Sequence, residues 1–183
     1  MAKSYLNIPG YPIGLRNNNP GNLRTGDNWQ GMIGENQNFV VFENIAWGIR
    51  ALGKDLTTKI NNGYDTIELI LFRYAPPNVD NNNTLNYIAY VSRYTGWPQN
   101  KTLTADRATL ERLARAIINF EIGSSYANMI TDADIKEGFD LISGGGPGML
   151  GPAGFTLSAG LLLFALFLFA TMPKMPKAKS LFT

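Results

Sequence analysis

An asparagine-rich stretch near the start of the chain restricts the fold most strongly. Residues 14–24 read Gly-Leu-Arg-Asn-Asn-Asn-Pro-Gly-Asn-Leu-Arg. Asparagine tolerates the left-handed backbone region and Pro20-Gly21 forces a turn, so this stretch is predicted to be a loop. Each asparagine amide also offers donors and an acceptor, which suits the hydroxyl and N-acetyl groups of a sugar. We therefore predict substrate contacts from Asn17, Asn18, Asn19 and Asn22, with turn formation alone as the alternative.

Apolar residues spaced three and four apart predict helices along much of the remaining sequence up to residue 142. One such segment covers residues 45–60, with Asn44 as its N-cap, and shorter ones cover 66–74 and 85–94. A long helix opens at Thr104 or Asp106 and ends at Glu121, and a final one covers residues 130–142 with Thr131 as its cap. Residues 37–42 are the only convincing strand candidate in the sequence. The predicted class is mainly α with a minor β element.

The amino-acid composition excludes several kinds of catalytic site. The chain has 183 residues with no cysteine and no histidine, so a Ser-His-Asp triad, a Cys-His pair, a His-ligated zinc site and disulfides are all excluded. We expect no metal and no cofactor. Residues 1–150 contain 13 Lys and Arg against 14 Asp and Glu, so this part has no basic footprint and we expect no specific nucleic-acid binding.

Glu121 is the best candidate for a catalytic group. It lies four residues after Ile117 and three after Ile118, on the apolar stripe of the predicted helix. Gly123 is a predicted helix stop, which places Glu121 in the last turn, where the helix dipole disfavours negative charge. Burial and the dipole both favour a carboxyl that stays protonated near neutral pH. The alternative is a glutamate that turns to solvent or pairs with an arginine.

A second carboxylate is less obvious. Glycosidic cleavage commonly uses two acids, and Glu35, in a loop before the predicted strand, is the first candidate for the second one, followed by Glu43 and Asp27. A lone acid would suit a transglycosylase, in which the C6 hydroxyl of the substrate completes the reaction.

The carboxyl-terminal part predicts a membrane anchor. Residues 144–154 are a Gly/Pro-rich linker, and residues 155–172 contain no charge and would span about 27 Å as a helix. Residues 173–183 form a basic tail. We predict a domain over 1–143, a linker, one transmembrane helix over 155–172 and the tail.

Several motifs resemble a family of phage and prophage structural proteins with a lysozyme-like, peptidoglycan-cleaving domain. The resemblance starts at the Arg16–Arg24 motif and continues through Trp29-Gln-Gly31, Phe39–Phe42, Trp47–Ala51, Tyr74–Pro77, Asn83-Thr84, Tyr87 and Phe120–Gly123. It covers roughly residues 14–140. The family more often has asparagine where this chain has Ile122, and the acid here follows the asparagine loop, so the resemblance implies a circularly permuted lysozyme-like fold.

The resemblance implies a virion enzyme that cleaves peptidoglycan glycan strands between N-acetylmuramic acid and N-acetylglucosamine. It implies Glu121 as general acid, with Tyr74 and Tyr87 among the substrate-binding residues. The predicted anchor would place the protein in the internal membrane of a virion, with the lipid bilayer and other capsid or membrane proteins as partners. The alternatives are a non-catalytic structural or wall-binding virion membrane protein that keeps the fold, and a host tail-anchored membrane protein. The sequence leaves open whether the product is anhydro or hydrolytic.

Overall fold

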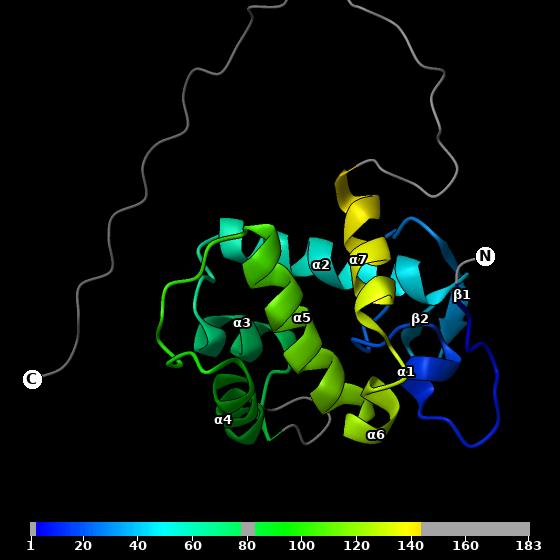
Figure 1. Cartoon of the computed structure of the whole chain (residues 1–183), viewed down its shortest axis with the longest axis horizontal. Helices are drawn as coiled ribbons and strands as arrows, with labels where there is room; N and C mark the ends of the chain where they lie inside the picture. Colours follow the sequence, from blue (N-terminus) through cyan, green and yellow to red (C-terminus); the bar gives the residue numbers. More distant parts are fainter. Residues whose placement is uncertain (1–2, 78–82, 144–183) are drawn as a thin grey trace, which may run out of the picture. The chain divides into compact units, whose positions relative to one another are not determined.

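The computed structural model describes residues 3–77 and 83–143. Two strands form an antiparallel hairpin, and helices make up most of the rest (Figure 1). In chain order the elements are α1 (Ile13–Arg16), β1 (Met32–Asn36), β2 (Phe39–Phe42), α2 (Ile45–Asn61), α3 (Ile67–Tyr74), α4 (Thr84–Thr95), α5 (Arg107–Ile122), α6 (Ser124–Ala127), α7 (Asp132–Asp140) and a 3-10 turn over Leu141–Ser143.

Polar caps determine where the longer helices begin. A side-chain oxygen accepts a hydrogen bond from the first-turn backbone of α2, α3, α4, α5 and α7; these caps are Asn44, Thr66, Asn83, Asp106 and Thr131. The predicted helices are therefore confirmed to within a few residues, and the caps Asn44 and Thr131 are confirmed. The cap of α5 is Asp106, the second of the two predicted openings.

Helix α5 occupies the centre of the described fold. It packs against α1, α2, α4 and α7, and Figure 1 shows it running through the middle of the domain. Leu113, Ile117 and Ile118 on its inner face are fully buried. Burying such a side chain stabilises the fold by about 1.5 to 3 kcal/mol. The carboxyl end of α5 is thereby held in a fixed position, and this end positions Glu121.

A hairpin turn joins β1 to β2. Gln37 and Asn38 both adopt positive φ, 51° and 64°, which is the backbone of a two-residue turn matched to the strand twist. The predicted strand over residues 37–42 is confirmed for Phe39–Phe42, whereas β1 was not predicted.

Helix α2 lies directly against the asparagine loop. A Cβ atom on Gly48 would lie 1.9 Å from the carbonyl oxygen of Asn18, so only glycine permits this approach. The same helix packs closely on α7, where a Cβ atom on Gly138 would lie 2.5 Å from Ile49. The asparagine loop near the start of the domain and α7 near its end therefore both pack against α2.

The predicted fold class is wrong in one respect. Within residues 3–77 and 83–143, no helix combines the length and apolar character needed to cross a bilayer. The structure gives no support for the expected transmembrane helix over 155–172, and those residues lie outside the described part of the chain, as do the linker and the tail. The class that the structure supports is mainly α-helical with one small two-stranded sheet.

Candidate active site around Glu121

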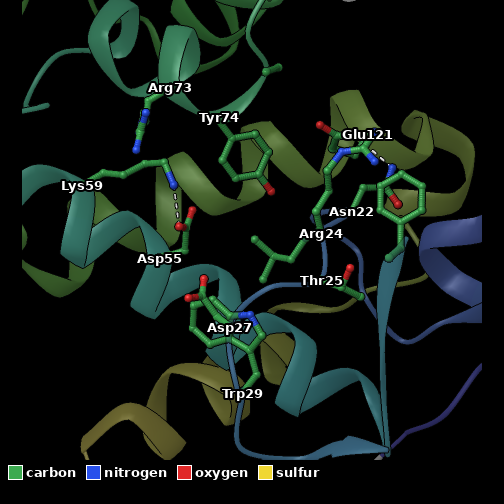
Figure 2. Close-up of a pocket in the computed structure, with 13 residues that line it drawn as sticks. Asn22, Arg24, Thr25, Asp27, Trp29, Asp55, Lys59, Arg73, Tyr74 and Glu121 are labelled. Carbon is green, nitrogen blue, oxygen red and sulfur yellow. Dashed lines mark hydrogen bonds and ion pairs between the residues drawn. The ribbon is translucent and has the colours of Figure 1, made fainter. Parts of the chain in front are cut away.

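A polar cavity of about 370 Å³ opens beside the end of α5 (Figure 2). Its walls come from the loop after α1, from β2, α2 and α3, and from α5. The lining residues are Asn22, Leu23, Arg24, Thr25, Asp27, Trp29, Phe39, Asp55, Lys59, Arg73, Tyr74, Ala75 and Glu121. Elements far apart in the sequence therefore form one concave surface.

Glu121 occupies the last turn of α5, as the sequence predicts. Gly123 follows the helix with φ of 78° and ends it, which confirms the predicted stop. Both carboxylate oxygens of Glu121 accept hydrogen bonds: Asn22 Nδ2 donates to Oε2 over 2.8 Å, and the Tyr87 hydroxyl donates to Oε1 over 2.8 Å. Two neutral donors thus fix the orientation of the carboxyl group.

The environment of Glu121 favours its protonated form. Burial raises the pKa of the carboxyl group, and this effect outweighs the hydrogen bonds from Asn22 and Tyr87 and the charge of Arg24, which all lower it. A carboxyl group with a raised pKa keeps its proton to higher pH than an ordinary glutamic acid and can donate it to a bound substrate. The same two donors stabilise the carboxylate that remains after proton transfer.

Two tyrosines support this arrangement from α3 and α4. The Tyr87 ring stacks on Phe120 with a centroid separation of 3.7 Å, which holds its hydroxyl toward Glu121. Tyr74 donates a hydrogen bond to the carbonyl oxygen of Gly21 and lines the cavity. Burial, followed by the negative charge of Glu121, raises the pKa of both phenols well above the ordinary value, so both remain hydrogen-bond donors.

The four predicted asparagines occupy different environments. Asn17, Asn18 and Asn19 are buried, with 1% or less of their surface exposed, and Asn22 is the member of the set that lines the cavity. The Asn18 side chain donates to the carbonyl oxygen of Phe42 and accepts from the Tyr5 backbone, at 3.1 and 2.8 Å. The Asn19 side chain donates to the carbonyl oxygens of Leu23 and Val40, at 2.8 and 3.0 Å.

Those bonds give Asn18 and Asn19 a structural role. Their amides pair with buried backbone groups of β2 and the loop, which would otherwise be left without partners. Asn17 contributes similarly, since its side-chain oxygen accepts from Asn36 at 3.0 Å and its carbonyl oxygen accepts from the Phe42 backbone at 2.9 Å. We therefore keep only Asn22 as a candidate substrate contact.

The candidates for a second carboxylate differ in whether they line the cavity. Glu35 is exposed on β1 and is not among the cavity residues, and Glu43 is also outside the cavity. Asp27 does line it, together with Asp55. The sequence analysis does not predict Asp55 as a site residue. Its spacing of four residues from Lys59 on α2 does indicate an ion pair. Arg73 and Trp29 also line the cavity without having been predicted as site residues.

Within residues 3–77 and 83–143, no group of three or more Asp, Glu, Cys or His side chains gathers in a way that could hold a metal ion.

Comparison with known proteins identifies the family. The chain is 37% identical over 134 residues to Protein P5 of Pseudoalteromonas phage PM2, a match that covers 69% of this chain and 79% of that protein. The chain belongs to the Protein P5 family. No protein-family model matches the chain, so membership in the P5 family rests on this relative. The part of the expected resemblance that concerns phage proteins is therefore confirmed, whereas a lysozyme-like activity of P5-family chains stays a prediction.

Proposed function

We propose that this chain is a phage virion component that cleaves peptidoglycan glycan strands between N-acetylmuramic acid and N-acetylglucosamine. Membership in the P5 family supports a role in a phage particle. The resemblance of several sequence motifs to those of lysozyme-like domains is the ground for the proposed substrate and reaction. Glu121 is the proposed general acid and base, and Asn22 and Tyr74, which line the cavity with it, are the proposed substrate-facing groups. Tyr87 is buried and is not among the cavity-lining residues, so its proposed role is to support Glu121 through their hydrogen bond.

The surroundings of Glu121 are the observation on which this proposal depends. Its carboxyl group lines a polar cavity, its pKa is raised by burial, and two neutral side chains hold both of its oxygens. A structural carboxylate at a helix end would more commonly face solvent or pair with a cation. A raised carboxyl pKa in a cleft is typical of a general acid, as in lysozyme, where the catalytic glutamic acid lies in an apolar pocket.

The proposed reaction needs one carboxyl group. Glu121 donates its proton to the glycosidic oxygen as the bond between that oxygen and C1 of the muramic sugar breaks. The C6 hydroxyl of the same sugar then attacks C1 and transfers its proton to the Glu121 carboxylate. The product is a 1,6-anhydro sugar and the acid is regenerated, so no catalytic water is consumed.

Hydrogen bonds from Asn22 and Tyr87 matter at the intermediate stage of this cycle. Both donors stay in place when Glu121 loses its proton, and they stabilise the resulting carboxylate while it waits to accept the second proton. General acid–base catalysis of this kind contributes about 10² to 10⁴-fold to the rate.

The decisive experiment incubates the full chain with purified peptidoglycan and identifies the released fragments by mass spectrometry. We expect muropeptides with anhydro-muramic ends. Reducing muramic or glucosamine ends would instead show hydrolysis and would direct attention to Asp27 or Asp55 as a second carboxylate. Sedimentation of the chain with peptidoglycan without any released fragment would contradict cleavage and favour a wall-binding protein.

A further inference from the structure

The cavity extends from Glu121 to a group of four charged side chains at its other end. Asp27 belongs to the loop before β1, Asp55 and Lys59 belong to α2, and Arg73 belongs to α3. Figure 2 shows Tyr74 between Glu121 on one side and Arg73, Lys59 and Asp55 on the other, with Asp27 beside Trp29. Burial, and after it the negative charges of Glu121 and Asp55, raises the pKa of Tyr74, so the Tyr74 phenol lies within reach of the charges at both ends. We call these four residues the charged end of the cavity.

Two members of the charged end neutralise each other. Lys59 and Asp55 form an i,i+4 ion pair on α2, with side chains that are 15% and 17% exposed. The Lys59 ammonium group also lies over the Tyr74 ring, 5.4 Å from its centroid. These contacts fix the pair as part of the cavity wall and leave little of its charge for a ligand.

The other two members are exposed and have no such partner. Asp27 and Arg73 both present their side chains to solvent, and neither forms an ion pair with any residue in the part of the chain that the structure describes. Asp27 still lies close enough to Asp55 for its charge to act on that carboxyl group. The Asp27 carboxylate and the Arg73 guanidinium therefore border the same cavity without an ion-pair partner in the part of the chain that the structure describes.

We propose that the charged end is a subsite for a zwitterionic ligand, namely the diamino-acid-containing stem peptide attached to the muramic sugar. This proposal rests on the proposed function, because it places the sugar near Glu121 and the peptide beyond Tyr74. The planar guanidinium of Arg73 binds a stem carboxylate, and Asp27 accepts from the free ammonium group of the diamino acid.

The balance of charge decides between this ligand and simpler ones. Asp27, Asp55, Lys59 and Arg73 sum to no net charge, so a purely anionic ligand attracted to Arg73 would be repelled by Asp27. An uncharged chitin-like glycan would leave both charges unused. A ligand with separated positive and negative groups is the one that satisfies both exposed side chains.

The test measures binding of the tripeptide N-acetyl-L-alanyl-γ-D-glutamyl-meso-diaminopimelate, whose one free amino group is that of the diamino acid, to the full chain by NMR titration. The variants are Arg73→Gln and Asp27→Asn, and the matched control is Arg93→Gln, which removes an exposed arginine from α4 outside the cavity. A second probe is the same tripeptide acetylated on the free amino group of its diamino acid, which removes that positive charge.

We expect Arg73→Gln to weaken tripeptide binding about five- to tenfold and Arg93→Gln to leave it unchanged. Asp27→Asn should weaken binding of the tripeptide but not of the second probe. Equal affinity for the two probes, equal binding by all the variants, or no binding by the unaltered chain would overturn the inference. Because this readout needs no catalysis, peptidoglycan cleavage without tripeptide binding rejects the subsite alone, and tripeptide binding without cleavage rejects the proposed reaction alone.

Discussion

Asn22 Nδ2 and Glu121 Oε2 are joined by a 2.8 Å hydrogen bond although the two residues lie 99 positions apart in the chain. The bond links the asparagine loop to the last turn of α5. The two sequence features that indicate a functional site, the asparagine loop and the helix-end glutamate, are therefore in direct contact, and each helps to hold the other in position.

Replacing Glu121 by glutamine should abolish cleavage while the fold is kept. Glutamine preserves the shape, and the Tyr87 hydroxyl can accept from the new amide as readily as it donated to the carboxylate. We expect peptidoglycan release to fall by about 10² to 10⁴-fold. Glu111→Gln, on the same helix but paired with Arg107 outside the cavity, is the matched control. Full activity in Glu121→Gln with unchanged circular dichroism would reject the assignment.

The same variant should gain stability relative to wild type as the pH rises. The folded-state pKa of Glu121 lies above its ordinary value of 4.5, so the folded state binds more protons than the unfolded state between those two values, and the wild-type free energy of unfolding falls as pH rises through this window. Glutamine does not titrate. Urea unfolding should therefore give Glu121→Gln a larger free energy of unfolding than wild type at pH 7, and this difference should become smaller toward pH 4. A difference that is independent of pH would contradict the raised pKa.

Tyr87→Phe should shift the pH dependence of activity. The variant removes the hydrogen bond to Glu121 Oε1 and keeps the ring that stacks on Phe120. Because that hydrogen bond lowers the pKa of Glu121, its loss raises this pKa further, and the alkaline decline in kcat/KM should move to higher pH. Tyr90→Phe is the control, since Tyr90 also contacts Phe120 but forms no hydrogen bond with Glu121. Identical pH profiles for wild type and Tyr87→Phe would remove Tyr87 from the mechanism.

Glu35→Gln should leave cleavage within about twofold of wild type, because Glu35 is exposed on β1 and lies outside the cavity. Initial rates on labelled peptidoglycan provide the measurement. A loss comparable to that of Glu121→Gln would indicate a two-carboxylate mechanism with a different cavity geometry.

Asn19→Ala should destabilise the domain by about 2 to 4 kcal/mol, because the side chain satisfies the carbonyl oxygens of Leu23 and Val40 and accepts from the Leu23 backbone. Asn86→Ala, at an exposed position on α4, should change stability by less than about 0.5 kcal/mol. Chemical denaturation compares the two. Equal stability of both variants would show that the Asn19 amide contributes little to the fold.

Local patterns predict the helices and the position of Glu121 in the last turn of α5, because both depend on near neighbours in the chain. The spacing of Ile117, Ile118 and Glu121 determines which face of α5 is buried, and Gly123 ends the helix regardless of tertiary contacts. The strand β1 is not predicted because its residues, Met-Ile-Gly-Glu-Asn, do not alternate between apolar and polar and include Gly34. Its turn residues, Gln37 and Asn38, are also an uncommon pair for that backbone.

The composition of the cavity could not be predicted in the same way. The asparagine amides face inward because β2 presents unpaired carbonyl groups beside the loop, and the approach of those two segments is a tertiary event. Asp27, Asp55 and Arg73 meet for the same reason: they come from a loop and two helices that only the complete packing brings together.

The 99-residue separation between Asn22 and Glu121 also has a kinetic consequence. Contacts that close long loops form late in folding, because their entropic cost has to be met by structure already in place. A chain still emerging from the ribosome lacks Glu121 until most of the domain has been synthesised. The Glu121 carboxyl group then lacks its hydrogen bond from Asn22 until the asparagine loop has packed against α5. Refolding followed by an Asn22 side-chain amide signal should therefore lag behind refolding followed by helix content.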